Sequence, residues 1–107
     1  MTSILGTDLS DTLFGDFVNN RIFGLFGNDT ISGAAGDDTI NGNQGLDRIY
    51  GDAGNDVLFG GQGDDNISGD SFLDTIGGND LLFGNLGEDR LFGDTGNDSV
   101  FWGKVMI

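Results

Sequence analysis

The sequence predicts an all-β fold built from repeated short strands and turns, and three observations support this prediction. A glycine begins a new unit every nine residues over most of the chain, an aspartate recurs at position six of the unit, and an aliphatic residue recurs at position eight. Recurrence at a fixed short period is the sequence signature of a repeat architecture. Because the acidic and aliphatic columns keep one phase, we interpret each unit as one turn followed by one strand.

The repeat accounts for nearly the whole chain of 107 residues. Nine units have nine residues, and the unit at residues 69–83 has fifteen. The units are 6–14, 15–23, 24–32, 33–41, 42–50, 51–59, 60–68, 69–83, 84–92 and 93–101. We therefore predict a single domain over residues 1–107, with a lead-in strand at residues 1–5, repeats over 6–101 and a C-terminal cap at 102–107.

Positions seven to nine of each unit predict a strand of three residues. Side chains alternate across a strand, so only the residue at position eight points into the core. This position is aliphatic in every unit: Leu13, Ile22, Ile31, Ile40, Ile49, Leu58, Ile67, Leu82, Leu91 and Val100. Residues at position nine then face outward. Phe59, Phe83 and Phe101 are expected on one sheet, either as a protective stack of rings or as a surface for self-association.

Positions one to six form the predicted turn. Glycine at positions one and four allows positive φ angles and lets carbonyl groups crowd together, and Asn or Asp at positions five and six suits turns. Position six reads Asp11, Asn20, Asp29, Asp38, Asp47, Asp56, Asp65, Asp80, Asp89 and Asp98. A turn that gathers carbonyl oxygens around a carboxylate predicts a hard-cation site. Calcium, which takes about six to eight oxygen ligands in flexible geometry, suits such a turn better than magnesium.

The composition restricts the partners of the chain. It has 18 acidic and 4 basic residues, no Cys and no His, and a net charge of −14. Nucleic acids and anionic lipids are bound through Lys and Arg, so we expect neither nucleic-acid binding nor membrane insertion. Thiolate and imidazole metal sites are excluded, as is general-base catalysis by histidine. No apolar run approaches the length of a transmembrane helix. We expect no enzymatic activity.

The unit resembles the calcium-binding nonapeptide G-G-x-G-x-D-x-U-x of the repeats-in-toxin (RTX), or hemolysin-type, family. Residues 60–68, GGQGDDNIS, match it at every defined position, and residues 24–59 and 84–101 differ only at the second glycine. The resemblance implies a right-handed parallel β-roll, in which two units form one coil and calcium ions lie between stacked turns. It also implies that position-six carboxylates and loop carbonyls hold the ions.

Two stacks of five turns follow from this arrangement, with four gaps in each stack and at most about eight calcium sites. One stack contains Asp11, Asp29, Asp47, Asp65 and Asp89, and the other contains Asn20, Asp38, Asp56, Asp80 and Asp98. The implied side-chain ligands are the aspartates of both stacks. The implied carbonyl ligands are those of Gly33, Ala35, Gly36, Gly42, Gln44, Gly45, Gly51, Ala53, Gly54, Gly60, Gln62 and Gly63.

The first two units depart from the family pattern. Leu9 and Val18 replace the glycine at position four, and Asn20 replaces the aspartate at position six. We therefore expect weak binding, or none, in the two N-terminal gaps.

The long unit departs in a second way and leaves two alternatives. Either residues 72–77 are an insertion in the loop, or residues 69–77 are an extra unit followed by a truncated one. In the extra-unit alternative Asp74 and Ile76 take the ligand and core roles, and the stack assignments after them change.

Calcium is expected to be required for folding. The aliphatic core is small relative to the backbone entropy of a Gly-rich chain, and the negative charge adds self-repulsion. Extracellular calcium sites have Kd values of about 10⁻⁴ to 10⁻³ M, so the chain would stay unfolded in the cytosol and fold after export. The first residues, MTSILGTDLS, lack the features of a secretory signal peptide. We expect an extracellular or cell-surface protein, exported by type I secretion.

Two functions are compatible with these properties. The first is a structural module that binds calcium and self-associates, through the Phe59, Phe83 and Phe101 face or through the open ends of the roll. The alternative is a C-terminal folding and type I secretion module cut from a larger secreted enzyme or toxin.

Overall fold

The computed structural model describes residues 2–70 and 78–103, and every regular element in them is a β-strand. The strands are β1 (Thr2–Leu5), β2 (Thr12–Phe14), β3 (Asn20–Phe23), β4 (Thr30–Ser32), β5 (Thr39–Asn41), β6 (Arg48–Tyr50), β7 (Val57–Phe59), β8 (Asn66–Ser68), β9 (Leu81–Phe83), β10 (Arg90–Phe92) and β11 (Ser99–Phe101). Within these ranges no helix is long and apolar enough to cross a membrane. From β2 onward each strand covers positions seven to nine of one unit, as predicted; β3 begins one residue earlier.

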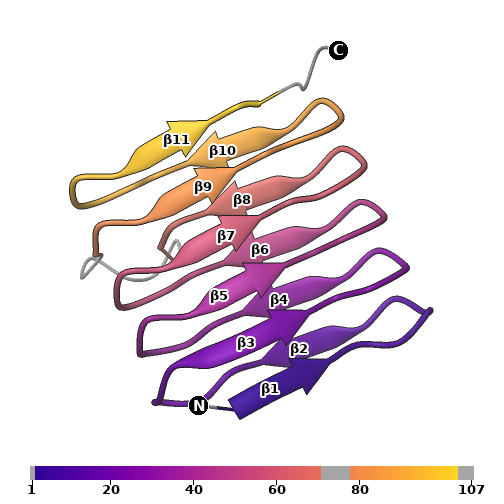
Figure 1. The fold of residues 1–107 in the computed structure, drawn as a ribbon, viewed down its shortest axis with the longest axis horizontal. Helices are drawn as coiled ribbons and strands as arrows, with labels where there is room; N and C mark the ends of the chain where they lie inside the picture. The colour runs from indigo at the N-terminus through magenta and orange to yellow at the C-terminus, as the bar shows by residue number, and fades with distance from the viewer. Residues whose placement is uncertain (1, 71–77, 104–107) are drawn as a thin grey trace.

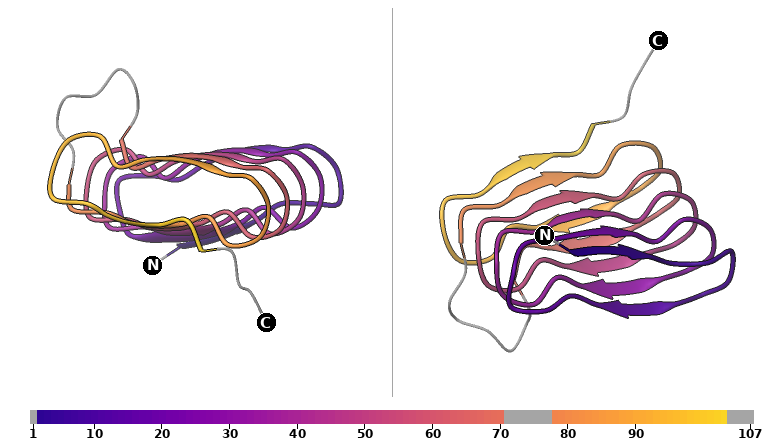
Figure 2. Two further views of the ribbon diagram at one scale, coloured as in Figure 1. Left: turned by 90° about the horizontal axis from the view of Figure 1, so that it is seen from above. Right: turned by 60° about the horizontal axis from the view of Figure 1, so that its bottom comes forward.

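The odd-numbered and even-numbered strands form two separate parallel sheets. The odd sheet has the order β1-β3-β5-β7-β9-β11, and the even sheet has the order β10-β8-β6-β4-β2. Two consecutive strands with their turns make one coil, and the coils stack in order along the chain (Figure 1). Viewed along the stack, the coils superimpose as a narrow oblong (Figure 2). The predicted parallel β-roll is confirmed.

The core lies between the two sheets and consists of the position-eight side chains. Ile22 pairs in register with Ile40 in the odd sheet, and Ile31 pairs with Ile49 in the even sheet. Residues in the middle coils are fully buried: Ile22, Ile31, Ile40, Ile49, Leu58, Ile67 and Leu82. Leu13 and Val100 are only partly buried, because the outermost coils have a neighbour on one side. The prediction that position eight forms the core is therefore confirmed.

The long unit, residues 69–83, keeps the phase of the roll. β9 pairs with β7 and β10 pairs with β8, so Leu82 lies opposite Leu58 and Leu91 lies opposite Ile67, each at a separation of 24 residues. Paired strands that do not span the long unit, such as β5 and β7, have a separation of 18. The strands that follow the long unit therefore keep the register that the insertion alternative requires. Asp74 and Ile76, which the extra-unit alternative places at positions six and eight, lie outside the described residues.

The turns adopt left-handed backbone conformations at positions two and four, whereas we expected them at positions one and four. Positive φ angles occur at position two in Leu25, Ala34, Asn43, Asp52, Gly61, Asn85 and Asp94, and at position four in Gly27, Gly36, Gly45, Gly54, Gly63, Gly87 and Gly96. Position one requires glycine for a different reason. A Cβ atom at Gly51 would lie 2.5 Å from Oδ2 of Asp56 and 2.6 Å from the carbonyl oxygen of Gly69. Glycine is therefore required at position one because a carboxylate oxygen and a carbonyl oxygen leave no room for a side chain, and not because of its φ angle.

One left-handed residue allows a test of the turn. Ala34 has a φ of 64°, a conformation that alanine adopts reluctantly and asparagine tolerates. We expect Ala34→Asn to raise the free energy of unfolding of the calcium-loaded protein by roughly 0.5 to 1 kcal/mol. Ala35→Asn is the matched control, because Ala35 follows in the same turn without a positive φ. Denaturant unfolding that ranks Ala34→Asn at or below the control would contradict this explanation.

The rings of Phe59, Phe83 and Phe101 form a continuous stack on the outside of the odd sheet. Neighbouring ring centroids are 5.0 Å apart, and the ring planes differ by 10° for the first pair and 9° for the second. The predicted stacking of position-nine rings is thus confirmed. Phe101 is 49% exposed, so the stack is open to solvent at the C-terminal end of the roll.

Candidate metal centre

The position-six side chains form two continuous columns, one in each stack of turns. The first column is Asp11, Asp29, Asp47, Asp65 and Asp89, and the second is Asn20, Asp38, Asp56, Asp80 and Asp98. The backbone N–H of each member donates to Oδ1 of the member in the next coil, with N···O distances of 2.7 to 2.8 Å throughout. The membership of each column is the one that the family resemblance implies under the insertion alternative. Parallel register between coils produces it, since equal positions of the unit lie above one another.

Most of these carboxylates are buried, and one oxygen of each has no partner. Asp29, Asp38, Asp47, Asp56, Asp65 and Asp80 are each 1% exposed. Oδ2 is enclosed and accepts no hydrogen bond in these six residues and in Asp89. A buried carboxylate oxygen without a donor is unfavourable unless a cation or a proton compensates it. The columns therefore place seven oxygens where a bound cation would stabilise the fold.

Carbonyl groups of position one lie beside these oxygens. The space that a Cβ would occupy at Gly24 is 2.6 Å from Oδ2 of Asp29 and 2.9 Å from the carbonyl oxygen of Gly42 in the next coil. The corresponding space at Gly60 is 2.6 Å from Oδ2 of Asp65 and 3.1 Å from the carbonyl oxygen of Gly84. A carboxylate oxygen and a carbonyl oxygen thus converge at these glycines. Hard oxygen donors of this kind are the ligands that calcium prefers.

Burial raises the pKa of the column carboxyls. The ordinary value of 3.8 rises to about 6 for Asp38, about 7 for Asp47, about 9 for Asp56, about 8 for Asp65 and about 7 for Asp80. The pKa values of Asp29, Asp89 and Asp98 are also raised. Loss of water around the charged form is the largest cause, and the hydrogen bond to Oδ1 opposes it. A metal-free roll at neutral pH therefore holds protons in the middle of the columns, and a cation favours their release.

The predicted carbonyl ligands lie in three different places. At position one, the carbonyls of Gly33, Gly42 and Gly51 face the position-one glycines of the preceding coils, and Gly60 lies beside Asp65. At position four, the carbonyls of Gly36, Gly45, Gly54 and Gly63 lie against the position-four glycines of the next coils. Position three contains Ala35, Gln44, Ala53 and Gln62, and the Gln62 carbonyl accepts a hydrogen bond of 3.2 Å from the N–H of Gly45. At the position-one glycines, carbonyl oxygens of the next coil thus lie beside the carboxylate oxygens of the columns.

The first members of the two columns differ from the rest. Thr7 donates its backbone N–H to Oδ2 of Asp11 at 2.6 Å, and its hydroxyl also contacts that carboxylate. Asn20 carries no charge and donates Nδ2–H to the carbonyl of Val18 at 2.9 Å. The two N-terminal gaps therefore hold less uncompensated negative charge. This arrangement supports the prediction that they bind calcium weakly.

Carboxylates alone cannot complete a coordination shell in this part of the chain. Within residues 2–70 and 78–103, no point gathers three or more His, Cys, Asp or Glu side chains. A calcium ion between two coils would meet at most two column carboxylates, so carbonyl or water oxygens must supply the remainder of about six to eight ligands. The residues present fit this requirement, because the neighbouring donors are carbonyl oxygens.

Sequence reasoning missed a second ladder at position five. The N–H of Asn55 donates to Oδ1 of Asp37 at 2.8 Å, and the N–H of Asn79 donates to Oδ1 of Asn55 at 2.7 Å. Asn97 continues the ladder by donating to Asn79. The recurrence of Asn and Asp at position five carries this signal, but by itself it indicates only a preference for turns. In the other stack Leu46 interrupts the ladder because its side chain has no acceptor.

Replacement of one column carboxylate separates its charge from its hydrogen bond. Asp56→Asn keeps an acceptor for the N–H of Asp38 but removes the charge. We expect the metal-free roll to become more stable at pH 7 and calcium binding in the two adjoining gaps to weaken at least about tenfold. Refolding of the calcium-free chain by a stabilising osmolyte, followed by circular dichroism, measures the first change, and equilibrium dialysis measures the second. Asp8→Asn, at an exposed site, controls for net charge; changes of equal size in the control would contradict the assignment of Asp56.

Comparison with known proteins agrees with the geometry of the columns. Four copies of the RTX calcium-binding nonapeptide repeat match the chain, at residues 5–40, 14–49, 41–76 and 77–101. No curated protein matched the sequence. Together the four matches extend from residue 5 to residue 101 and include both columns of position-six residues. The repeated glycines, the acidic columns and the parallel coils are thus features of one known repeat, and the chain belongs to the RTX calcium-binding nonapeptide repeat family.

Proposed function

We propose that this calcium-binding module folds only when calcium is bound and acts outside the cell as a structural, self-associating element. The observation that carries the proposal is the set of seven buried Oδ2 oxygens without hydrogen-bond partners. These oxygens disfavour the metal-free roll and favour the loaded one. Because ions that bind only the folded turns add their binding free energy to folding, calcium acts as the switch.

The ions are proposed to lie between position-six residues of adjacent coils. Oδ2 would come from the seven aspartates in which it has no partner: Asp29, Asp38, Asp47, Asp56, Asp65, Asp80 and Asp89. Asp98, whose Oδ2 lies beside Gly93, would also contribute. Asp11 would contribute more weakly, because Thr7 already contacts it. Carbonyls of the intervening turns complete the shell. Eight gaps exist between the column members, and six remain when the two N-terminal gaps are set aside. Residues 1–107 would form one structural domain, with no catalytic role for its carboxylates.

Self-association is supported by exposed apolar side chains and open sheet edges. Large apolar residues of the N-terminal strands and turns are strongly exposed, including Leu5, Leu9, Phe14, Phe17 and Val18. Exposed apolar surface and unpaired edge strands are both common contact sites. However, the odd sheet has six strands and the even sheet has five, and β1 and β11 are the two edge strands of the odd sheet. If β11 of one molecule paired with β1 of the next, the even sheet would lack one strand at the junction. The stack of Phe59, Phe83 and Phe101 needs no such additional strand.

Sedimentation velocity tests self-association. We expect the mass to increase with protein concentration at millimolar calcium, and Phe83→Ser to reduce this increase because it interrupts the ring stack. Phe14→Ser, at an exposed residue of the even sheet, is the matched control for the face. A larger effect of Phe14→Ser would assign the contact to the N-terminal end. A monomer at all concentrations would refute self-association but not calcium-dependent folding.

The extracellular location follows from the same coupling. A chain that folds at millimolar calcium remains extended in a calcium-poor cytosol, which suits export in an unfolded state, and it folds outside. This property also supports the alternative of a C-terminal folding and type I secretion module of a larger enzyme or toxin. Export of a passenger protein fused ahead of residues 1–107 would favour that alternative, whereas a fusion retained in the cell would refute its strong form.

A further inference from the structure

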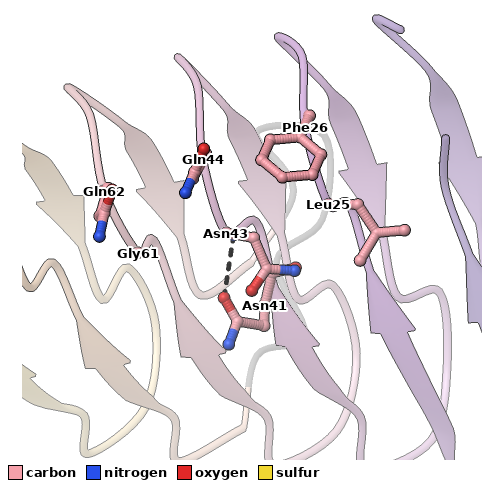
Figure 3. A pocket seen from close by; sticks show the side chains of 7 residues that line it. All are labelled: Leu25, Phe26, Asn41, Asn43, Gln44, Gly61 and Gln62. Atoms are coloured by element: carbon pink, nitrogen blue, oxygen red, sulfur yellow. Dashed lines mark hydrogen bonds between the residues drawn. The ribbon is translucent and has the colours of Figure 1, made fainter. Parts of the chain in front are cut away.

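A hollow of about 370 Å³ lies on the outside of three successive turns of the first column. These turns connect β3 to β4, β5 to β6 and β7 to β8. Its lining residues are Leu25, Phe26, Asn41, Asn43, Gln44, Gly61 and Gln62 (Figure 3). Figure 3 shows the Gln44 and Gln62 side chains side by side on adjacent turns, with Asn41 and Asn43 below Gln44 and the two apolar side chains on the opposite flank.

Two small residues produce the hollow. At position nine of the odd sheet, Asn41 lies in register between Phe23 and Phe59, so it interrupts a row that otherwise carries rings. At position two, Gly61 has no side chain, whereas the preceding coils of this column carry Leu25 and Asn43. The hollow is therefore specific to this part of the repeat and does not recur in every coil.

The lining contains no charged residue and combines carboxamides with an apolar wall. The Asn43 N–H donates to Oδ1 of Asn41 at 2.9 Å, which holds the Asn41 side chain in place. The Gln44 and Gln62 carboxamides make no hydrogen bond to another described residue, and both are exposed. Each carboxamide can donate and accept, which matches hydroxyl groups. Phe26 is 49% exposed and presents an apolar ring at the edge.

We propose that this hollow binds a hexose unit of a neutral polysaccharide. The Gln44 and Gln62 carboxamides would bond neighbouring hydroxyl groups, and Phe26 with Leu25 would pack against the apolar C–H face of the sugar ring. A neutral ligand suits an uncharged lining on a chain with a net charge of −14, which would repel an anion. The site uses side chains outside the carboxylate columns. It goes beyond the proposed calcium-dependent assembly and requires only the folded roll.

The test titrates the calcium-loaded full chain with cellohexaose, maltohexaose and mannohexaose, and follows the side-chain amide signals by NMR. We expect saturable shifts of the Gln44 and Gln62 carboxamide signals with at least one of these sugars. Phe26→Ala should weaken the affinity about three- to tenfold. Leu86→Ala is the matched control, because Leu86 occupies position three of the same column, is 44% exposed and lies outside the hollow.

Two further variants keep the proposal falsifiable. Asn41→Phe fills the gap between Phe23 and Phe59 and should abolish the shifts, while Gln62→Ala removes one hydrogen-bonding group and should weaken them. Circular dichroism of the same samples shows whether each variant is folded, so failure of sugar binding is distinguished from failure of calcium-dependent folding. Absence of saturable shifts in the folded wild-type chain would overturn the proposal. The proposal would also be overturned if Phe26→Ala changed self-association but not sugar binding. That result would indicate that an aromatic side chain of a second copy of the chain occupies the hollow.

Discussion

Removal of calcium is expected to convert the chain from a β-roll to an unfolded coil in a single cooperative transition. The physical reason is the burial of seven Oδ2 oxygens without partners in a chain whose net charge is −14. Bound calcium would give the buried oxygens a partner and would reduce the repulsion between the negative charges. A site at one hundred times its Kd contributes about 2.7 kcal/mol, so six occupied gaps would contribute on the order of 10 kcal/mol or more. This exceeds the net stability of many domains of similar size.

Far-ultraviolet circular dichroism measures this transition while calcium is titrated from chelator to about 10 mM. Magnesium at the same concentrations is the control, and we expect it to be far less effective because it requires stricter octahedral geometry and holds its water. A β spectrum that stays unchanged in chelator would show that metal-free packing of Ile40, Leu58 and their neighbours suffices for the fold. That result would contradict calcium-dependent folding, although it would leave calcium binding itself intact.

Acidification is expected to stabilise the metal-free roll, in the direction opposite to its effect on the loaded protein. Burial raises the pKa of Asp56 to about 9 and that of Asp65 to about 8, from 3.8. A raised pKa in the folded state contributes stability below the unfolded pKa and loses it as the pH rises through the folded pKa. The metal-free roll therefore gains most below about pH 4 and loses this stability between about pH 4 and pH 9. Calcium requires the ionised carboxylates, so its binding weakens as the pH falls.

Dialysed, metal-free protein followed by circular dichroism from pH 9 to pH 3 would reveal this gain of β structure. The double variant Asp56→Asn and Asp65→Asn should show a shallower pH dependence, because it removes the two carboxyls whose pKa values rise to about 9 and about 8. Sedimentation velocity in the same samples separates folding from association near the sequence pI of about 4.1. β structure that increases with rising pH in the absence of calcium would contradict the proposed role of the buried columns.

Much of the fold could be predicted because the period places each side chain relative to its own strand. Ile40 and Leu82 both point inward because side chains alternate along each strand, and the six additional residues of the long unit between them do not change this. The insertion was harder to predict, because the sequence allows Asp74 or Asp80 to occupy position six. Pairing of β9 with β7 decides in favour of Asp80. Register between coils is a long-range property that one unit does not contain.

The metal centre was predictable in its residues and less so in its atoms. Aspartate at position six indicates a carboxylate in each turn, but not which oxygen remains without a partner. The expected positive φ at position one was wrong, because glycine there makes room for Oδ2 of the aspartate and for a carbonyl of the next coil. The hollow at Asn41 was also missed. Its lining combines residues from three successive turns of the first column, from Leu25 to Gly61, and the sequence of one unit does not show which side chains meet across turns.

The sequence by itself determined the short repeated strands, the aliphatic core at position eight and the position-six aspartates outside the long unit. These features depend on alternation along a strand and on a nine-residue period, which are local properties of the chain. Only the tertiary structure decided the chemistry of each carboxylate. Adjacent coils lie close enough for the N–H of Asp38 to bond Oδ1 of Asp56, and this contact leaves Oδ2 enclosed and free to bind a cation.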